Sequence, residues 1–114
     1  MKHLEEMTWN AASSLMGIAV IYRRGGEGIN LTVVPGMSGN QYLNFKGKPL
    51  QDPTKIFTAG VADLRNFYPP KTGDVIQFRE TGQRYAVSKE ATGAAYNEIG
   101  GYGTMIQIHT VEER

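Results

Sequence analysis

Residues 72–88 read TGDVIQFRETGQRYAVS, and this stretch decides the fold class of the chain. Two runs rich in β-branched and aromatic residues, TGDVIQFR and RYAVS, flank the turn sequence ETGQ, a pattern typical of a β-hairpin. Because side chains alternate between the two faces of a strand, one face of this hairpin is predicted to be apolar. The residues expected to point inward are Ile76, Phe78, Tyr85 and Val87.

A second hairpin is predicted over residues 18–36. IAVIYR begins at Ile18, the glycine-rich RGGEG forms a loose loop, and INLTVV follows with apolar and polar residues in alternation. Pro35 and Gly36 end its second strand. The alternating residues of that strand are Ile29, Leu31 and Val33.

Further elements lie downstream of each hairpin. KIFTA at 55–59 and TMIQIHTV at 104–111 predict two more strands, and in the last one Ile106 and Ile108 face opposite to His109. GVADLRNFYPP, residues 60–70, predicts a helical turn that the two prolines terminate. ATGAAYNEIGGYG, residues 91–103, is predicted to be irregular.

The N-terminal part and the central part of the chain have other patterns. Apolar residues at helical spacing over 4–16 predict a short amphipathic helix, with Gly17 as its stop. Residues 36–54 mix turn residues with a possible strand at 41–46. Two interpretations of this loop stay open: an arm that reaches a channel or an adjoining ring, or a plain hairpin strand paired with 55–59.

These elements predict a mainly β fold: a small β-barrel or sandwich of about six strands with an N-terminal helix. No βαβ alternation is present, and a length of 114 residues suits a single domain over 1–114. The barrel is expected over 18–111, with the long loop at 36–54.

Composition excludes several classes of function. The absence of cysteine excludes a disulfide scaffold, a thiolate metal site and a cysteine nucleophile. Tight sequence-specific binding to nucleic acid is disfavoured because 12 basic residues nearly balance 11 acidic ones. No apolar run approaches the roughly 18 residues of a membrane span, and MKHLEEM lacks the apolar segment of a secretory signal, so we expect a soluble protein without a membrane partner.

Polar side chains form no recognisable catalytic pattern. The histidines and aspartates are too few and too separated to form a site, and no serine lies in a G-x-S-x-G motif. No catalytic, cofactor-binding or metal-binding residue is therefore nominated, and no cofactor is expected. His109 is interpreted as an ordinary surface or interface histidine. Asp74, which follows Gly73, is expected to accept hydrogen bonds from nearby backbone N–H groups and to fix the start of a strand.

The order and spacing of several motifs resemble the small neck proteins of tailed phages, the head-completion, stopper and tail-attachment proteins that join head to tail. The resemblance covers residues 9–110. Its motifs are W-x5-L (Trp9, Leu15), VIYRRG (20–25), IFTAGVADL (56–64), P-x-x-GDVI (70–76), RYAVS (84–88) and MIQIHT (105–110).

The resemblance implies a non-enzymatic structural protein of the head-tail connector. Its β-barrel protomer is expected to form a ring, a hexamer, between the portal or its adaptor and the tail terminator or tail tube. Packaged DNA is expected to pass through the lumen without sequence-specific binding. The expected location is the virion neck, and the host cytoplasm during assembly. The expected interaction residues are Arg23, Arg24, Glu27, Tyr42, Leu43 and Phe45.

Two other classes of function remain open. The first is a small SH3-like or OB-like binding barrel that contacts nucleic acid or a peptide through a basic and aromatic face containing Arg79, Arg84 and Tyr85. The second is an enzyme, against which the missing acid-base pairs count.

Overall fold

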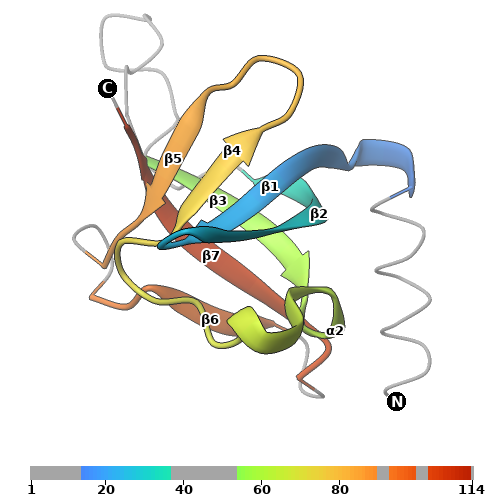
Figure 1. Cartoon of the computed structure of the whole chain (residues 1–114). Helices are drawn as coiled ribbons and strands as arrows, with labels where there is room; N and C mark the ends of the chain where they lie inside the picture. Colours follow the sequence, from blue (N-terminus) through green and yellow to red (C-terminus); the bar gives the residue numbers. More distant parts are fainter. Residues whose placement is uncertain (1–13, 37–53, 90–92, 100–102, 114) are drawn as a thin grey trace, which may run out of the picture.

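The computed structural model describes residues 14–36, 54–89, 93–99 and 103–113. In these ranges, seven antiparallel strands follow one another in space as β3-β2-β1-β4-β5-β7-β6. Strand β3 also pairs with β7, so six of the strands close into a barrel and β6 is added outside it (Figure 1). The predicted mainly β fold is confirmed, and it is a barrel. The strands are β1 (Ile18–Arg24), β2 (Glu27–Gly36), β3 (Thr54–Gly60), β4 (Val75–Phe78), β5 (Arg84–Val87), β6 (Tyr96–Ile99) and β7 (Met105–Glu112).

Both predicted hairpins are confirmed. Strand β4 pairs with β5, with Ile76 opposite Tyr85, and β1 pairs with β2. The predicted loose loop of the first hairpin is wrong, since Arg24 lies opposite Glu27 and only Gly25 and Gly26 form the turn. Such a two-residue turn requires positive φ, and Gly25 has a φ of 62°.

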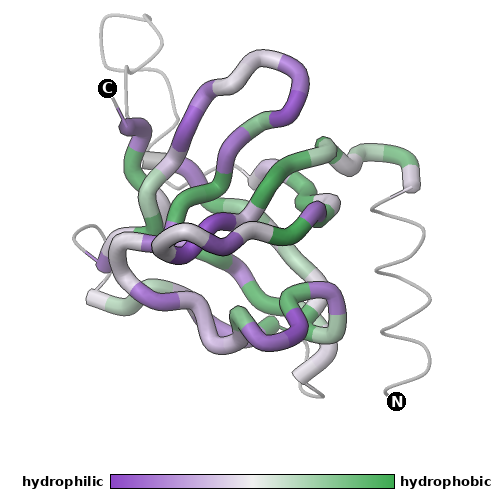
Figure 2. The backbone as a smooth tube through the Cα atoms, viewed as in Figure 1, coloured by the Kyte–Doolittle hydropathy of each residue, from purple (hydrophilic) through white to green (hydrophobic). Residues whose placement is uncertain are grey.

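The barrel interior is filled by side chains from all six strands of the barrel. All four residues predicted to point inward from 72–88 do so: Ile76, Tyr85 and Val87 are buried and Phe78 packs against the core. Within this core the Phe57 ring makes edge contacts with the rings of Phe78 and Tyr85, with centroids 5.9 and 5.3 Å apart. Figure 2 shows hydrophilic residues around the β4–β5 turn and apolar residues along the first part of β1, whereas apolar and hydrophilic residues are mixed along β7.

A short helical segment covers one end of the barrel. Helix α2 (Val61–Leu64) and the 3-10 turn η1 (Arg65–Phe67) follow β3 directly, which confirms the predicted helical turn. Leu64 and Phe67 are buried in the core, so the segment is anchored at both of its turns. Pro69 and Pro70 then lead the chain toward β4.

The prediction of irregular structure over 91–103 is wrong for Tyr96–Ile99, which forms β6. On one edge of β7, strand β5 pairs with the last residues of the strand, from Thr110 onward. The same edge is therefore free of β5 from Met105 to Ile108. Strand β6 occupies this part of the edge. Its sequence shows no clear alternation of apolar and polar residues, because two polar residues, Asn97 and Glu98, are adjacent in its middle. Both are exposed in the structure.

Some predictions fall outside the described residues. Residues 14–16 are helical, whereas the rest of the helix predicted over 4–16 lies outside the description. The same holds for residues 37–53, which include the possible strand at 41–46. No helix in the described part of the chain has the length and apolar character needed to cross a membrane.

Candidate interaction surface

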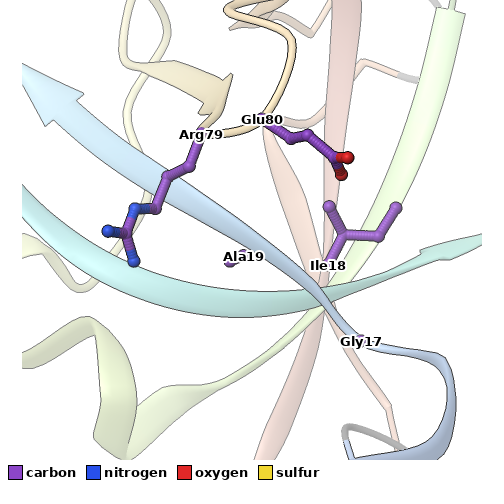
Figure 3. A pocket seen from close by; sticks show the side chains of 5 residues that line it. All are labelled: Gly17, Ile18, Ala19, Arg79 and Glu80. Atoms are coloured by element: carbon purple, nitrogen blue, oxygen red, sulfur yellow. The ribbon is translucent and has the colours of Figure 1, made fainter.

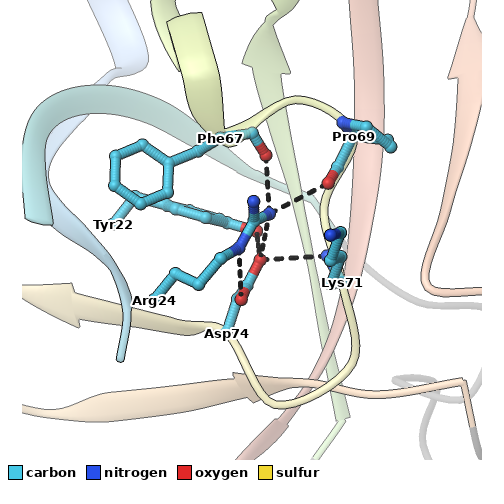
Figure 4. A network of polar contacts seen from close by, with 6 residues as sticks. All are labelled: Tyr22, Arg24, Phe67, Pro69, Lys71 and Asp74. Atoms are coloured by element: carbon cyan, nitrogen blue, oxygen red, sulfur yellow. Dashed lines mark hydrogen bonds and ion pairs between the residues drawn. The ribbon is translucent and has the colours of Figure 1, made fainter. Parts of the chain in front are cut away.

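A buried polar network joins strand β1 to the start of strand β4 (Figure 4). The Asp74 carboxylate is its centre: Oδ2 accepts hydrogen bonds from the Tyr22 hydroxyl at 2.6 Å, from Arg24 Nη2 at 2.8 Å and from the Lys71 backbone N–H at 2.9 Å. Its Oδ1 accepts a bond from Arg24 Nε at 3.0 Å. The predicted backbone-binding role of Asp74 is confirmed, and two side chains from β1 extend it.

The Arg24 side chain reaches further, to the last residue of η1 and to the chain that follows it. Its Nη2 donates to the backbone oxygens of Phe67 at 2.8 Å and Pro69 at 3.0 Å. The guanidinium also lies over the Phe67 ring, 5.4 Å from the ring centroid. One arginine on β1 therefore holds both the carboxylate before β4 and the chain that follows η1.

The charges in this network are fixed at neutral pH. Burial by itself would raise the pKa of Asp74, but the hydrogen bonds from Arg24 and Tyr22 outweigh it and hold the pKa below its ordinary value. Burial, and next the hydrogen bond to Asp74, raise the pKa of Tyr22 far above 10. The network is thus a guanidinium, a carboxylate and a neutral phenol, with a structural role in holding the barrel and the η1 segment together.

Three of the predicted interaction residues lie together at the β1–β2 turn. Arg24 is engaged as described, and Arg23 Nε donates to Gln77 Oε1 at 2.8 Å. Glu27 is exposed at the first residue of β2. That these residues contact a partner stays a prediction. The other three, Tyr42, Leu43 and Phe45, lie outside the described residues.

Of the two positions predicted for His109, surface or interface, the surface position is wrong, because the side chain is buried and only 8% of the residue is exposed. An interface position stays a prediction. His109 lies where the edge of β7 changes partners: its backbone N–H donates to Ala95, and its backbone oxygen accepts from Ser88. The ring Nε2 lies 2.6 Å from Asn97 Oδ1 on β6, while Nδ1 has no partner in the described part of the chain. Burial lowers the pKa of His109.

The basic and aromatic face proposed for a nucleic-acid barrel does not assemble on β5. Tyr85 points into the core and is 5% exposed, whereas the neighbouring Arg84 faces the other side of the strand, as strand geometry requires. The Arg84 guanidinium is also paired with Glu113, with Nε 2.8 Å from Oε1. Arg79 lies beyond the end of β4.

Two recesses open near the start of β1. One, of about 410 Å3, is lined by the first residues of β1 and by Arg79 and Glu80 of the β4–β5 turn (Figure 3). The other, of about 350 Å3, opens over the aromatic cluster of Phe57, Phe78 and Tyr85. Sequence reasoning missed both recesses, because each combines residues from strands that are distant in the sequence.

Comparison with known proteins adds no relative. No family model, curated protein or solved structure matches this chain. Within residues 14–36, 54–89, 93–99 and 103–113, no three histidine, aspartate or glutamate side chains are grouped so that they could hold a metal ion.

Proposed function

We propose that this chain is a structural protein of a phage head-tail connector, the protomer of a ring in the neck between the portal or its adaptor and the tail. The ring helps to retain packaged DNA and presents a docking surface to the tail. Its expected stoichiometry is six, and it acts without cofactor or catalysis.

The observation that carries this proposal is that the motifs of the resemblance come together in space. VIYRRG lies in β1, and P-x-x-GDVI leads into β4. Arg24 of the first motif and Asp74 of the second form a partly buried ion pair with an Nη2 to Oδ2 distance of 2.8 Å. Motifs that are far apart in the sequence therefore form one structural unit, which supports treating their order as a family pattern.

The packing of the barrel supports a ring of several copies. Large side chains such as Tyr22, Phe57 and Ile76 fill the interior and are almost completely buried. DNA therefore has no path through a single barrel. A lumen wide enough for a duplex has to lie between several protomers.

The competing proposal, a small barrel that binds nucleic acid or a peptide, has weaker support. Its proposed face is divided, because Tyr85 belongs to the core and Arg84 is paired with Glu113. Near-neutral charge also supplies little attraction for a polyanion.

Negative-stain imaging of the purified protein, alone and mixed with a portal complex, tests the proposal. Rings seated on the portal are the expected result. Oligonucleotide binding measured at several salt concentrations is the second arm. Tight binding that weakens steeply with salt, in a protein that never associates with the portal, would favour the competing barrel.

A further inference from the structure

Arg65 has a backbone conformation that normally belongs to glycine. Its φ of 52° and ψ of −123° are those of the first central residue of a type II′ turn. Among the described residues it is the one non-glycine residue with positive φ. A side chain in this conformation destabilises the folded state relative to glycine, so we expect an interaction of the arginine side chain that offsets this cost.

No interaction of the Arg65 side chain within the described part of the chain offsets this cost. Arg65 is exposed, and its guanidinium makes no hydrogen bond or ion pair within the described part of the chain. Its backbone oxygen accepts a bond from the Tyr68 N–H at 3.3 Å, which any residue type can do. By contrast, the guanidiniums of Arg23, Arg24 and Arg84 all have partners inside the molecule.

Arg65 is nevertheless held on a rigid base. Phe67, two residues later, is buried and packs edge-on against Tyr22, with ring centroids 5.8 Å apart. Arg24 binds the backbone oxygens of Phe67 and Pro69. We call residues 65–70 the ledge. Because the ledge is fixed by β1, little conformational freedom is lost when a partner binds it.

A recess that contains a carboxylate, a group that can pair with a guanidinium, lies at the other end of strands β1 and β4. At the ledge end, Arg23 lies opposite Val75; at the far end, the Arg79 N–H donates to Ala19. The recess of about 410 Å3 opens here, lined by Gly17, Ile18, Ala19, Arg79 and Glu80. Figure 1 shows the β4–β5 turn and α2 at opposite ends of the barrel.

The recess offers a carboxylate and apolar surface together. Figure 3 shows the side chains of Arg79 and Glu80 pointing to opposite sides of the first residues of β1. Glu80 is exposed and makes no ion pair in the ranges that the structure describes. Leu15 and Met16, just before the recess, are 85% and 60% exposed. Carboxylate and guanidinium groups pair with a fixed fork geometry, which favours arginine over lysine.

We infer that Arg65 on the ledge of one copy pairs with Glu80 in the recess of a second copy of this chain. This inference rests on the proposed ring. The two surfaces lie at opposite ends of the barrel, so the contact is head-to-tail, and such contacts form closed rings when the rotation between copies closes. A polyanion such as DNA is a poorer partner, because the chain has 12 basic and 11 acidic residues and is close to neutral.

Two substitutions at the same position separate the side chain from the backbone. Arg65→Ala removes the guanidinium and keeps the energetic cost of positive φ. Arg65→Gly removes the guanidinium and that cost, because glycine adopts positive φ freely. We expect Arg65→Ala to leave the thermal midpoint nearly unchanged and Arg65→Gly to raise it by a few degrees. Both variants should weaken self-association by about tenfold or more, measured by sedimentation velocity over a concentration series.

Charge exchange identifies the acceptor. Arg65→Glu and Glu80→Arg should each weaken association, and the double variant should recover most of it. Lys89→Ala, the removal of an exposed cation elsewhere on the surface, is the matched control and should change nothing.

Four results would overturn the inference. A thermal midpoint that falls in Arg65→Gly would show that the conformation is not unfavourable for arginine. Unchanged association in Arg65→Ala and Arg65→Gly, or no recovery in the double variant, would remove this contact while the proposed ring stands. A wild-type chain that remains monomeric at high concentration and on the portal would overturn both the contact and the proposed function.

Discussion

Arg24 and Asp74 are 50 residues apart in the sequence and form a two-point ion pair, with Nη2 2.8 Å from Oδ2 and Nε 3.0 Å from Oδ1. The Asp74 side chain is 4% exposed and that of Arg24 is 28% exposed, so solvent screens the pair only in part. This pair, with the bonds from Arg24 to the chain after η1, fixes the end of the barrel that carries the ledge.

Asp74→Asn should destabilise the protein by about 2–4 kcal/mol, because it leaves the Arg24 guanidinium without its charged partner in a partly buried site. Urea unfolding at neutral pH measures the change in the free energy of unfolding. The matched control is Glu113→Gln, which breaks an ion pair whose side chains are both 41% exposed and should cost at most about 1 kcal/mol. Equal effects of the two substitutions would contradict a structural role for the network.

Stability should fall in acid through the same carboxylate. The pKa of Asp74 in the folded state lies below its ordinary value of 3.8, so the unfolded state binds the proton first as pH falls. The contribution of Asp74 is complete above about pH 4 and is lost as pH falls through the folded-state pKa. Unfolding free energies across this range should show a weaker acid dependence in Asp74→Asn, and an unchanged dependence would count against this account.

A second pH effect is expected from His109. Its pKa is lowered by burial from 6.5, so its contribution to stability is present above that pH and is lost as pH falls toward the folded-state value. Protonation would place a second N–H at Nδ1, which has no acceptor in the described part of the chain. His109→Gln should flatten the stability profile just below pH 6.5, and chemical unfolding at closely spaced pH values measures the slope. A variant with the wild-type slope would assign the effect to another group.

Phe57 is predicted to dominate the core energetics. Phe57→Ala should cost about 3–5 kcal/mol, since it removes a fully buried ring that contacts both Phe78 and Tyr85. Tyr85→Phe keeps the aromatic cluster and serves as the control, with an expected change below about 1.5 kcal/mol. Denaturant unfolding of the two variants compares them directly, and a small effect of Phe57→Ala would mean that the barrel core can collapse around the missing ring.

Much of the fold could be predicted from the sequence because strand periodicity is local. The alternation in 72–88 identified the inward residues of β4 and β5 correctly. Gly73 followed by Asp74 correctly indicated a carboxylate that binds backbone N–H groups. These features depend on neighbouring residues, and the side chains themselves carry the signal.

The polar network around Arg24 and Asp74 depends on contacts between residues that are far apart in the sequence, which no local pattern indicates. Nothing in the sequence indicated that Arg24 would reach the backbone of Phe67 and Pro69, because the two segments meet only after the barrel has formed. Arg65 was equally hidden, since a II′ turn is normally marked by glycine and an arginine gives the opposite signal.

The local sequence is enough to predict which segments of the two hairpins become strands and which of their faces are buried, because covalent spacing and hydrophobicity act over a few residues. Three features follow from the folded barrel and from no local pattern: the pairing of β3 with β7, the addition of β6 and the burial of His109. Each of these depends on which strand edge remains unpaired after the other strands have closed. That is a property of the whole barrel, and YNEI became a strand because the edge of β7 beside it was open.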